Sequence, residues 1–113
     1  IEELRNDPFV VLNYKGYTDS SNHLTIIRLP MVVNERRFYE EKHKSMIKER
    51  RIGIQLHYVP IHSQPYYIER YGNDKSIVNA YKYAASHISI PNFVGLKQKE
   101  IKRVAQALRD IYV

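Results

Sequence analysis

Two histidines and three tyrosines lie close together in the middle of the chain, within residues 53–67. His57 and His62 are five residues apart, and Tyr58 follows the first histidine directly. Imidazole titrates near neutral pH and can take up or give a proton, and a phenol can donate to hydroxyl or phosphate oxygens. The segment therefore predicts a polar binding site or an acid–base site. The alternative is that the histidines are tied by hydrogen bonds at the end of a strand and the tyrosines pack the edge of a domain.

The two histidines do not form a convincing metal site. The chain has no cysteine, and the nearest acid after His62 is Glu69, seven residues further along. Zinc sites need three or four ligands at fitting spacing, and this segment supplies only two. Motifs of independent catalysis are also missing, namely a phosphate-cradling glycine loop, a nucleophile elbow and paired carboxylates. We expect no metal site and no complete catalytic site in this chain.

The composition is typical of one globular domain, residues 1–113. Of the 113 residues, 43% are hydrophobic and 27% are charged, as in ordinary folded domains. No apolar run approaches the roughly 20 residues that span a bilayer. With the absence of cysteine, this predicts a cytoplasmic protein without a membrane segment. The net charge of +6 would suit an anionic partner, but no nucleic-acid-binding motif occurs, and we expect no nucleic acid partner.

The elements that must position the histidines follow from the apolar periodicity. The end of a helix is expected in residues 1–7, strands at 9–14, 23–29, 53–59 and 88–90, and helices at 34–51, 64–71, 75–86 and 97–112. The last helix has the clearest pattern, with apolar residues at offsets 0, 3, 4, 7, 10 and 11 from Ile101. This order predicts an α+β fold in which a small antiparallel or mixed sheet is covered mainly on one side by helices.

The same patterns predict which residues share a face within an element. Asn34 is expected to cap the first long helix, and Gly16 to lie in a loop. The residues expected to share a face are Leu24, Ile26 and Arg28 in the second strand, Phe38, Met46 and Ile47 in the first long helix, and Ile54, Leu56 and Tyr58 in the third strand.

The run from Gly53 to Tyr67, followed by Glu69-Arg70-Tyr71-Gly72, resembles the C-terminal region of the DegT/DnrJ/EryC1/StrS family of sugar aminotransferases, which depend on pyridoxal phosphate. It is most similar to the branch of UDP-4-amino-4,6-dideoxy-N-acetyl-altrosamine transaminases of pseudaminic acid biosynthesis, with its pattern G-I-x-V-Q-V-H-Y-x-P-x-H-x-Q-P-Y-Y. Residues 22–29, residues 88–96 and the last helix agree in order and spacing. Arg51 departs from the family, which usually has glycine there, so that this turn is either strained or reached differently.

The resemblance implies that the chain is the C-terminal small domain of a fold-type I aminotransferase, a longer protein. The reaction implied is amino transfer from glutamate to a UDP-4-keto-6-deoxy sugar. Pyridoxal 5′-phosphate would be held by the N-terminal domain through a Schiff-base lysine. No lysine of this chain lies in a sequence like that motif, so we assign no catalytic or cofactor-binding residue and expect the segment alone to be inactive. The implied partners are the N-terminal cofactor domain, the UDP-sugar and glutamate, and a second copy in a homodimer.

The resemblance also implies a substrate-binding set at the edge of the cleft. Its members would be Gln55, His57, Tyr58, Pro60, Ile61 and His62. In this hypothesis His57 and Tyr58 contact sugar or phosphate oxygens and His62 supports the loop, since imidazole and phenol donate to oxygens while presenting an apolar ring to the sugar. Two alternatives remain open: a small basic module that binds an anionic ligand or a protein partner without catalysis, and an interaction surface through which the chain dimerises.

Overall fold

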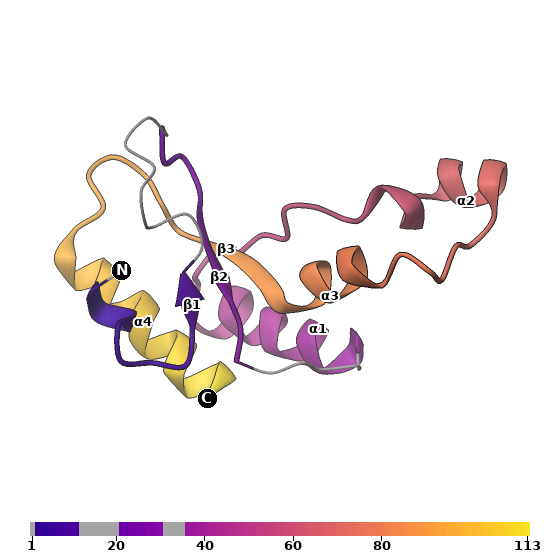
Figure 1. Cartoon of the computed structure of the whole chain (residues 1–113). Helices are drawn as coiled ribbons and strands as arrows, with labels where there is room; N and C mark the ends of the chain where they lie inside the picture. Colours follow the sequence, from indigo (N-terminus) through magenta and orange to yellow (C-terminus); the bar gives the residue numbers. More distant parts are fainter. Residues whose placement is uncertain (1, 12–20, 31–35) are drawn as a thin grey trace.

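The computed structural model describes residues 2–11, 21–30 and 36–113, and for residues 36–39 it describes the backbone alone. Figure 1 shows the elements in chain order. They are a 3-10 helix Glu2–Leu4, β1 Val10–Val11, β2 Thr25–Arg28, α1 Arg36–Lys44, a π-helix Ser45–Glu49, a 3-10 helix Ile61–Ser63, α2 Pro65–Tyr71, α3 Val78–Ser86, β3 His87–Ile90 and α4 Gln98–Tyr112. The predictions for Gly16, Asn34, the side chain of Phe38 and the end of the first strand lie outside the described residues.

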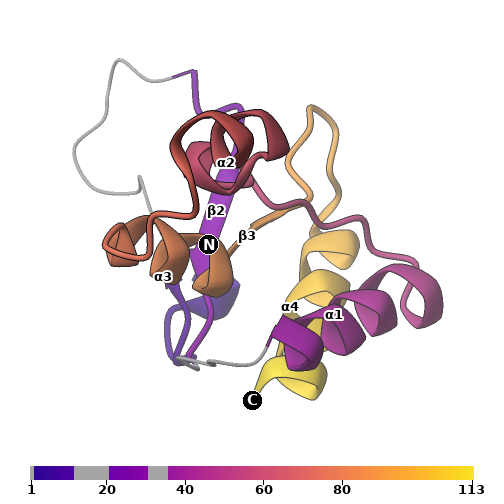
Figure 2. The same cartoon turned by 90° about the vertical axis from the view of Figure 1, so that its right-hand side faces the viewer.

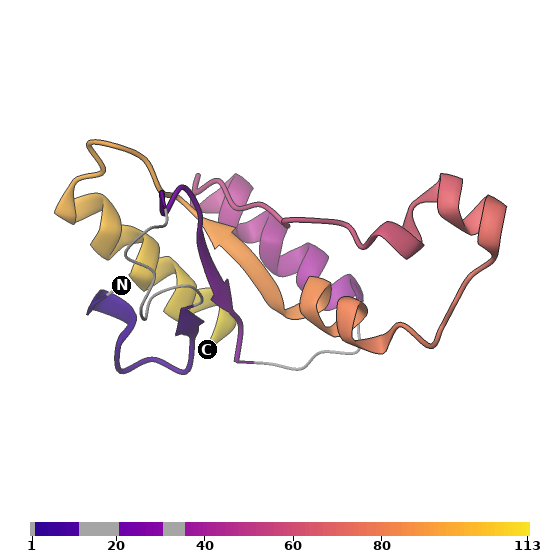
Figure 3. The same cartoon turned by 45° about the horizontal axis from the view of Figure 1, so that its top comes forward.

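The three strands form an antiparallel sheet in the order β1-β2-β3. β2 is central: Val11 pairs with its Ile27 on one side, and Ile88 of β3 pairs with the same residue on the other. Figures 2 and 3 show that α1 and α4 lie on the same side of this sheet. The predicted α+β fold, a small antiparallel sheet covered mainly on one side by helices, is confirmed.

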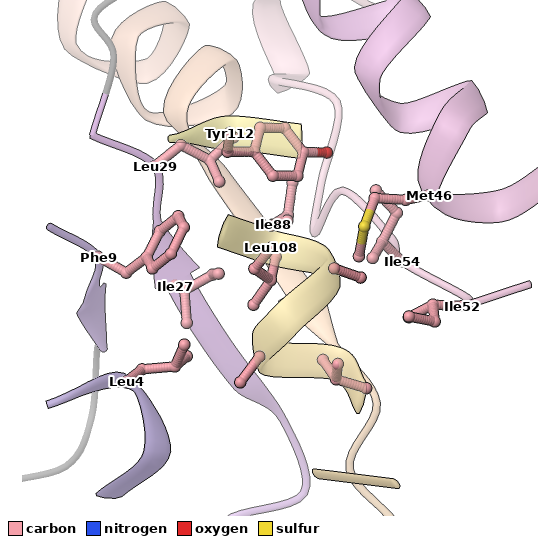
Figure 4. Close-up of a cluster of buried hydrophobic side chains, with 13 residues drawn as sticks. Leu4, Phe9, Ile27, Leu29, Met46, Ile52, Ile54, Ile88, Leu108 and Tyr112 are labelled. Atoms are coloured by element: carbon pink, nitrogen blue, oxygen red, sulfur yellow. The ribbon is translucent and has the colours of Figure 1, made fainter. Parts of the chain in front are cut away.

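The core lies between the sheet and these two helices (Figure 4). The predicted apolar stripe of the last helix is confirmed, because Val104, Ala105, Leu108 and Tyr112 are buried in α4. The cluster consists of Leu4, Phe9, Ile27, Leu29, Met46, Ile52, Ile54, Ile88, Val104, Ala105, Ala107, Leu108 and Tyr112. Burying one large side chain of this kind stabilises the fold by roughly 1.5–3 kcal/mol.

Ile26 and Arg28 share one face of β2, as predicted, but the opposite face is the buried one. Ile27 and Leu29 are buried, whereas Ile26 is half-buried and Arg28 is exposed. Both alternating sets of this segment contain apolar residues, so the local pattern does not decide between them. The pairing of Ile27 with Ile88 decides it, because register in a sheet sets which face every side chain occupies.

The first long helix changes its geometry at residue 45. After α1 the backbone continues as the π-helix Ser45–Glu49, in which the Arg50 N–H donates to the Ser45 carbonyl at 3.1 Å. A π-turn holds more residues than an α-turn and rotates the positions that follow. Within this segment Met46 is completely buried, but Ile47 is 48% exposed, and the prediction that both face inward is wrong for Ile47.

Arg51 ends this helix in the left-handed region, with φ 53°. The Ile52 N–H reaches back across it to the Met46 carbonyl at 3.0 Å. Left-handed residues commonly end helices, and they are usually glycine because a Cβ is disfavoured there. Of the two possibilities left by the sequence, the structure shows the strained turn.

The third predicted strand, residues 53–59, is reduced to a single bridge between Gln55 and Ser89 of β3. Ile54 is buried, but Leu56 and Tyr58 are 43% and 75% exposed, so these three residues do not share one buried face. The length of β3 explains this. Antiparallel continuation would place Gly53 opposite Pro91, which has no N–H, and residues beyond His57 opposite α3 instead of a strand.

After the bridge, residues 56–77 leave the body of the molecule and carry α2 at their far end; we call this segment the arm (Figures 1 and 3). The radius of gyration is 15.5 Å, whereas a compact domain of this length has about 13 Å. Many large apolar side chains of the arm are exposed. They are Leu56, Tyr58, Val59, Ile61, Tyr66, Tyr67, Ile68, Tyr71 and Ile77.

Candidate functional site

His57 is held at the base of the arm by a hydrogen bond to the sheet. Its Nδ1 lies 2.6 Å from the Oγ of Ser89. Ser89 is itself fixed through its backbone, because its N–H donates to the Gln55 carbonyl at 2.8 Å and its carbonyl accepts from the Gln55 N–H at 3.1 Å. The half-buried imidazole of His57 thus has one nitrogen anchored to β3.

Strand alternation explains why these side chains meet. Ile54 and Ile88 are core residues, so Gln55 and Ser89, their neighbours along the chain, lie on the opposite face of the sheet. His57 follows Gln55 by two residues and returns to that face. Sequence reasoning did not single out Ser89. The available signal was a small polar residue between two isoleucines in a buried strand, where a hydroxyl needs a partner.

Tyr58 lies directly against His57. The two rings are 4.7 Å apart between centroids and make an angle of 83°, an edge-to-face arrangement. Tyr58 is 75% exposed, so its phenol lies in solvent beside the imidazole. The pair presents two hydrogen-bonding groups at the surface, and both are of a type that can donate to oxygen atoms.

Residues 60–64 form a tight turn that leads into α2. The Pro60 carbonyl accepts from both the backbone N–H and the hydroxyl of Ser63, at 2.9 and 2.7 Å. Pro65 begins α2 at its first turn, where the missing N–H of proline carries no penalty. Ile61 is 68% exposed on the outside of this turn.

His62 is anchored to a different element from His57. Its ring packs edge-to-face on Tyr81 of α3, with centroids 4.6 Å apart. Its Nε2 is buried and has no hydrogen-bond partner among the described residues. Hydrogen bonds from Ser76 are the main reason that the pKa of Asp74 is lowered, and His62 adds a smaller electrostatic contribution. No hydrogen bond or ring contact within the described part of the chain joins His57 to His62.

The structure therefore places the six sequence-predicted residues in two groups. Gln55, His57 and Tyr58 lie at the sheet end of the arm, and Pro60, Ile61 and His62 lie further along it. Within residues 2–11, 21–30 and 36–113, no group of three or more His, Cys, Asp or Glu side chains could hold a metal ion. In the same part of the chain, no helix has the length and apolar character to cross a membrane.

The lysines in the described part of the chain do not fit a pyridoxal phosphate site. A Schiff-base lysine needs a pocket that also holds the cofactor ring and phosphate. Lys42 is half-buried, but its Nζ donates to the Ile111 carbonyl and lies over the Tyr112 ring. Every other described lysine is exposed. No step of a cofactor reaction can be derived from these residues.

Comparison with known proteins gives a consistent result. Residues 2–109 match the DegT/DnrJ/EryC1/StrS aminotransferase family. The spore coat polysaccharide biosynthesis protein SpsC of Bacillus subtilis (strain 168) is 31% identical over 64 residues, which are 56% of this chain and 16% of SpsC.

Among solved structures, Helicobacter pylori PseC, an aminotransferase involved in the biosynthesis of pseudoaminic acid, superposes with a TM-score of 0.79. The superposition covers 98% of this chain and 29% of PseC, at 23% sequence identity. At that identity the likeness shows the fold. The chain spans less than a third of the length of either relative.

Proposed function

The chain belongs to the DegT/DnrJ/EryC1/StrS aminotransferase family, and we propose that it is the C-terminal small domain of a nucleotide-sugar aminotransferase. In the whole enzyme an amino group would pass from glutamate to the 4-keto carbon of a UDP-linked 6-deoxy sugar. The observation that carries this proposal is the fold match to PseC, which covers nearly all of this chain but 29% of PseC. A small domain of a longer enzyme accounts for both numbers.

The cofactor and the chemistry belong, in this proposal, to an N-terminal domain. Pyridoxal phosphate would be bound there, because the described lysines of this chain are exposed or already engaged. The cofactor supplies the electron sink that amino transfer requires. The role of this chain is to close one side of the substrate cleft and to place hydrogen-bond donors against the sugar nucleotide.

The exposed arm supports a large partner surface. Tyr66 and Tyr71 of α2 are 60% and 72% exposed, and Tyr67 and Ile68 of the same helix are 39% and 37% exposed; we call these four residues the apolar edge of the arm. Extended apolar patches on soluble proteins mark interaction sites. We propose that the N-terminal domain and a second copy in a homodimer cover this edge in the whole enzyme.

His57 and Tyr58 are the residues that we propose contact oxygens of the sugar or the diphosphate. A half-buried imidazole in ring contact with an exposed phenol suits such a ligand, because both groups can donate to oxygen while their rings contact the sugar. Gln55, Pro60 and Ile61 would extend the same edge. His62 would support it through Tyr81, which lies on α3.

The proposal has a direct test in the coding region upstream of Ile1. That region should encode a further domain with a cofactor lysine, and a start codon immediately before Ile1 would refute the domain assignment. In the full-length protein, His57→Ala should lower kcat/KM for the UDP-sugar about tenfold or more, since a hydrogen bond to a charged group is worth about 1.5–3 kcal/mol. His23→Ala, which removes an exposed imidazole elsewhere, is the matched control. Unchanged kinetics for His57→Ala would remove His57 from the substrate edge.

The net charge of +6 favours one competing function, a stand-alone basic module that binds an anionic ligand. Calorimetric titration of the 113-residue chain with UDP separates the two. A module of that kind should bind UDP measurably by itself. A small domain with most of the cleft walls missing should bind it too weakly to detect.

A further inference from the structure

We propose that Ser89 is a positioning residue that holds His57 as the neutral tautomer with its proton on Nε2. His57 then presents an N–H donor to an oxygen atom of the ligand. The identity of that ligand rests on the proposed function, but the tautomer does not.

Ser89 stands out because its polar side chain is buried. Among the described residues, Ser89 is the only polar or charged residue that is buried, with 6% of its surface exposed. A serine hydroxyl has one hydrogen to donate, and its oxygen can also accept. Its partner is the Nδ1 of His57, at a distance of 2.6 Å.

Two arrangements of the protons would satisfy this distance, and they differ in what they leave unpaired. In one, the Ser89 hydroxyl donates to an unprotonated Nδ1. In the other, Nδ1–H donates to Oγ, and the hydroxyl hydrogen must find another acceptor. Among the described residues, Oγ has no further hydrogen-bond partner. A buried donor without an acceptor loses its hydration and gains nothing in return. The first arrangement is favoured, so Nδ1 accepts and the proton of the neutral ring lies on Nε2.

The backbone of Ser89 is held on both sides by paired segments of the sheet, which fixes the position of its hydroxyl relative to His57. Its backbone bonds to Gln55 on one side, and β2 pairs with it through Ile26 on the other. The strand that carries this hydroxyl therefore has little freedom to shift away from His57. A fixed partner at one ring nitrogen commonly decides which tautomer a functional histidine adopts and where its other nitrogen points.

The opposite edge of the ring is available for a ligand. Nε2 of His57 has no hydrogen-bond partner in the described part of the chain, and unlike Nε2 of His62 it is not a buried atom. The ring of Tyr58, which is 75% exposed, packs edge-to-face against this imidazole. An N–H donor at the open side of the ring suits an acceptor-rich group, such as a phosphate or a sugar hydroxyl. A ligand that offers only donors would not be favoured here.

The tautomer can be measured directly on the 113-residue chain by long-range ¹H–¹⁵N correlation spectra of the histidine rings. The wild-type chain at a pH where His57 is neutral should show Nε2–H for this residue. Ser89→Ala should convert it to a mixture of both tautomers, and Ser89→Thr, which keeps the hydroxyl, should restore the wild-type spectrum. His23 should not change in either variant. A wild-type Nδ1–H tautomer, or an unchanged ring spectrum in Ser89→Ala, would overturn the proposal. If Ser89→Ala does not fold, the wild-type spectrum alone decides.

Kinetics of the full-length enzyme test the consequence. Ser89→Ala should raise the KM for the UDP-sugar several-fold, and adding it to His57→Ala should cause no further loss, because Ser89 acts only through the Nε2–H donor that His57→Ala removes. Additive losses would contradict the coupling. If the spectra behave as expected but the enzyme transfers no amino group, the proposed function fails and the positioning role of Ser89 stands.

Discussion

Replacing Met46 and Ile47 separately by alanine should destabilise the chain by very different amounts, although the two residues are adjacent in one helical segment. The π-helix Ser45–Glu49 turns Met46 into the core, where it is completely buried, and leaves Ile47 48% exposed. A regular α-helix through the same residues would allow both to contribute to the inward stripe.

The expected losses follow from burial. Truncating a fully buried methionine to alanine costs about 2–5 kcal/mol, which includes the cavity it leaves. Complete burial of an isoleucine is worth roughly 1.5–3 kcal/mol. Ile47 keeps about half of that, and alanine returns a few tenths through its higher helix propensity. We expect Ile47→Ala to cost about 1 kcal/mol or less, and Met46→Ala to exceed it by at least about 1 kcal/mol.

Urea unfolding of the two variants, followed by circular dichroism, measures both free energies on the same scale. Met46→Leu is the matched control, since a swap that conserves volume usually costs less than about 1.5 kcal/mol. Equal losses for the two alanine variants, or a larger loss for Ile47→Ala, would contradict the unequal burial of the two side chains and place Ile47 in the core.

Three further changes test other parts of the structure. In urea unfolding, Arg51→Gly should leave the chain about 0.5–1 kcal/mol more stable than Arg51→Ala. Glycine relieves the strain of a Cβ at the left-handed φ of residue 51, and this gain exceeds the extra conformational entropy that glycine loses on folding. A glycine variant less stable than the alanine variant would contradict the strained turn. The hydrogen bond from Arg109 lowers the pKa of Asp7, so Asp7→Asn should lower the melting temperature at pH 7. The difference in melting temperature should vanish as the pH falls through the folded pKa of Asp7, below about 3.9. A difference that persists at pH 2 would show that the charge of Asp7 is not the cause. His62→Phe should keep the ring contact with Tyr81 and leave the free energy of unfolding unchanged or higher, since it removes a buried nitrogen without a partner among the described residues. A decrease in the free energy of unfolding above about 2 kcal/mol would show that this nitrogen is bonded.

The elements with strong local signals could be predicted from the sequence. α4 has a complete apolar stripe, and its helix is confirmed within one residue at its start. α2 begins at Pro65, and Gly72 with φ 79° follows its end, so both limits have a local cause. These predictions succeed because the residues that decide them are neighbours in the sequence.

The predictions that failed depend on residues far apart in the chain. The third strand is limited to one bridge because β3 is short and Pro91 follows it, which residues 53–59 do not reveal. The buried face of β2 is decided by the pairing of Ile27 with Ile88. The π-turn at Ser45 has no marker in the sequence that we can name.

In the candidate site, too, the sequence could indicate some residues and not others. His57 and Tyr58 attract attention by their type, and the structure brings their rings together. Ser89 is 32 residues from its partner, and nothing in the sequence connects a strand serine to a distant histidine. Whether the six predicted residues bind a substrate stays a prediction.

The two histidines of the proposed substrate edge have separate supports, and this shapes how the edge can work. His57 is tied to β3 through Ser89, so its position follows the sheet. His62 is tied to Tyr81 of α3, so its position follows the arm and the helix that closes it. A ligand that contacts both ends of residues 57–62 would therefore report on the angle between the arm and the sheet.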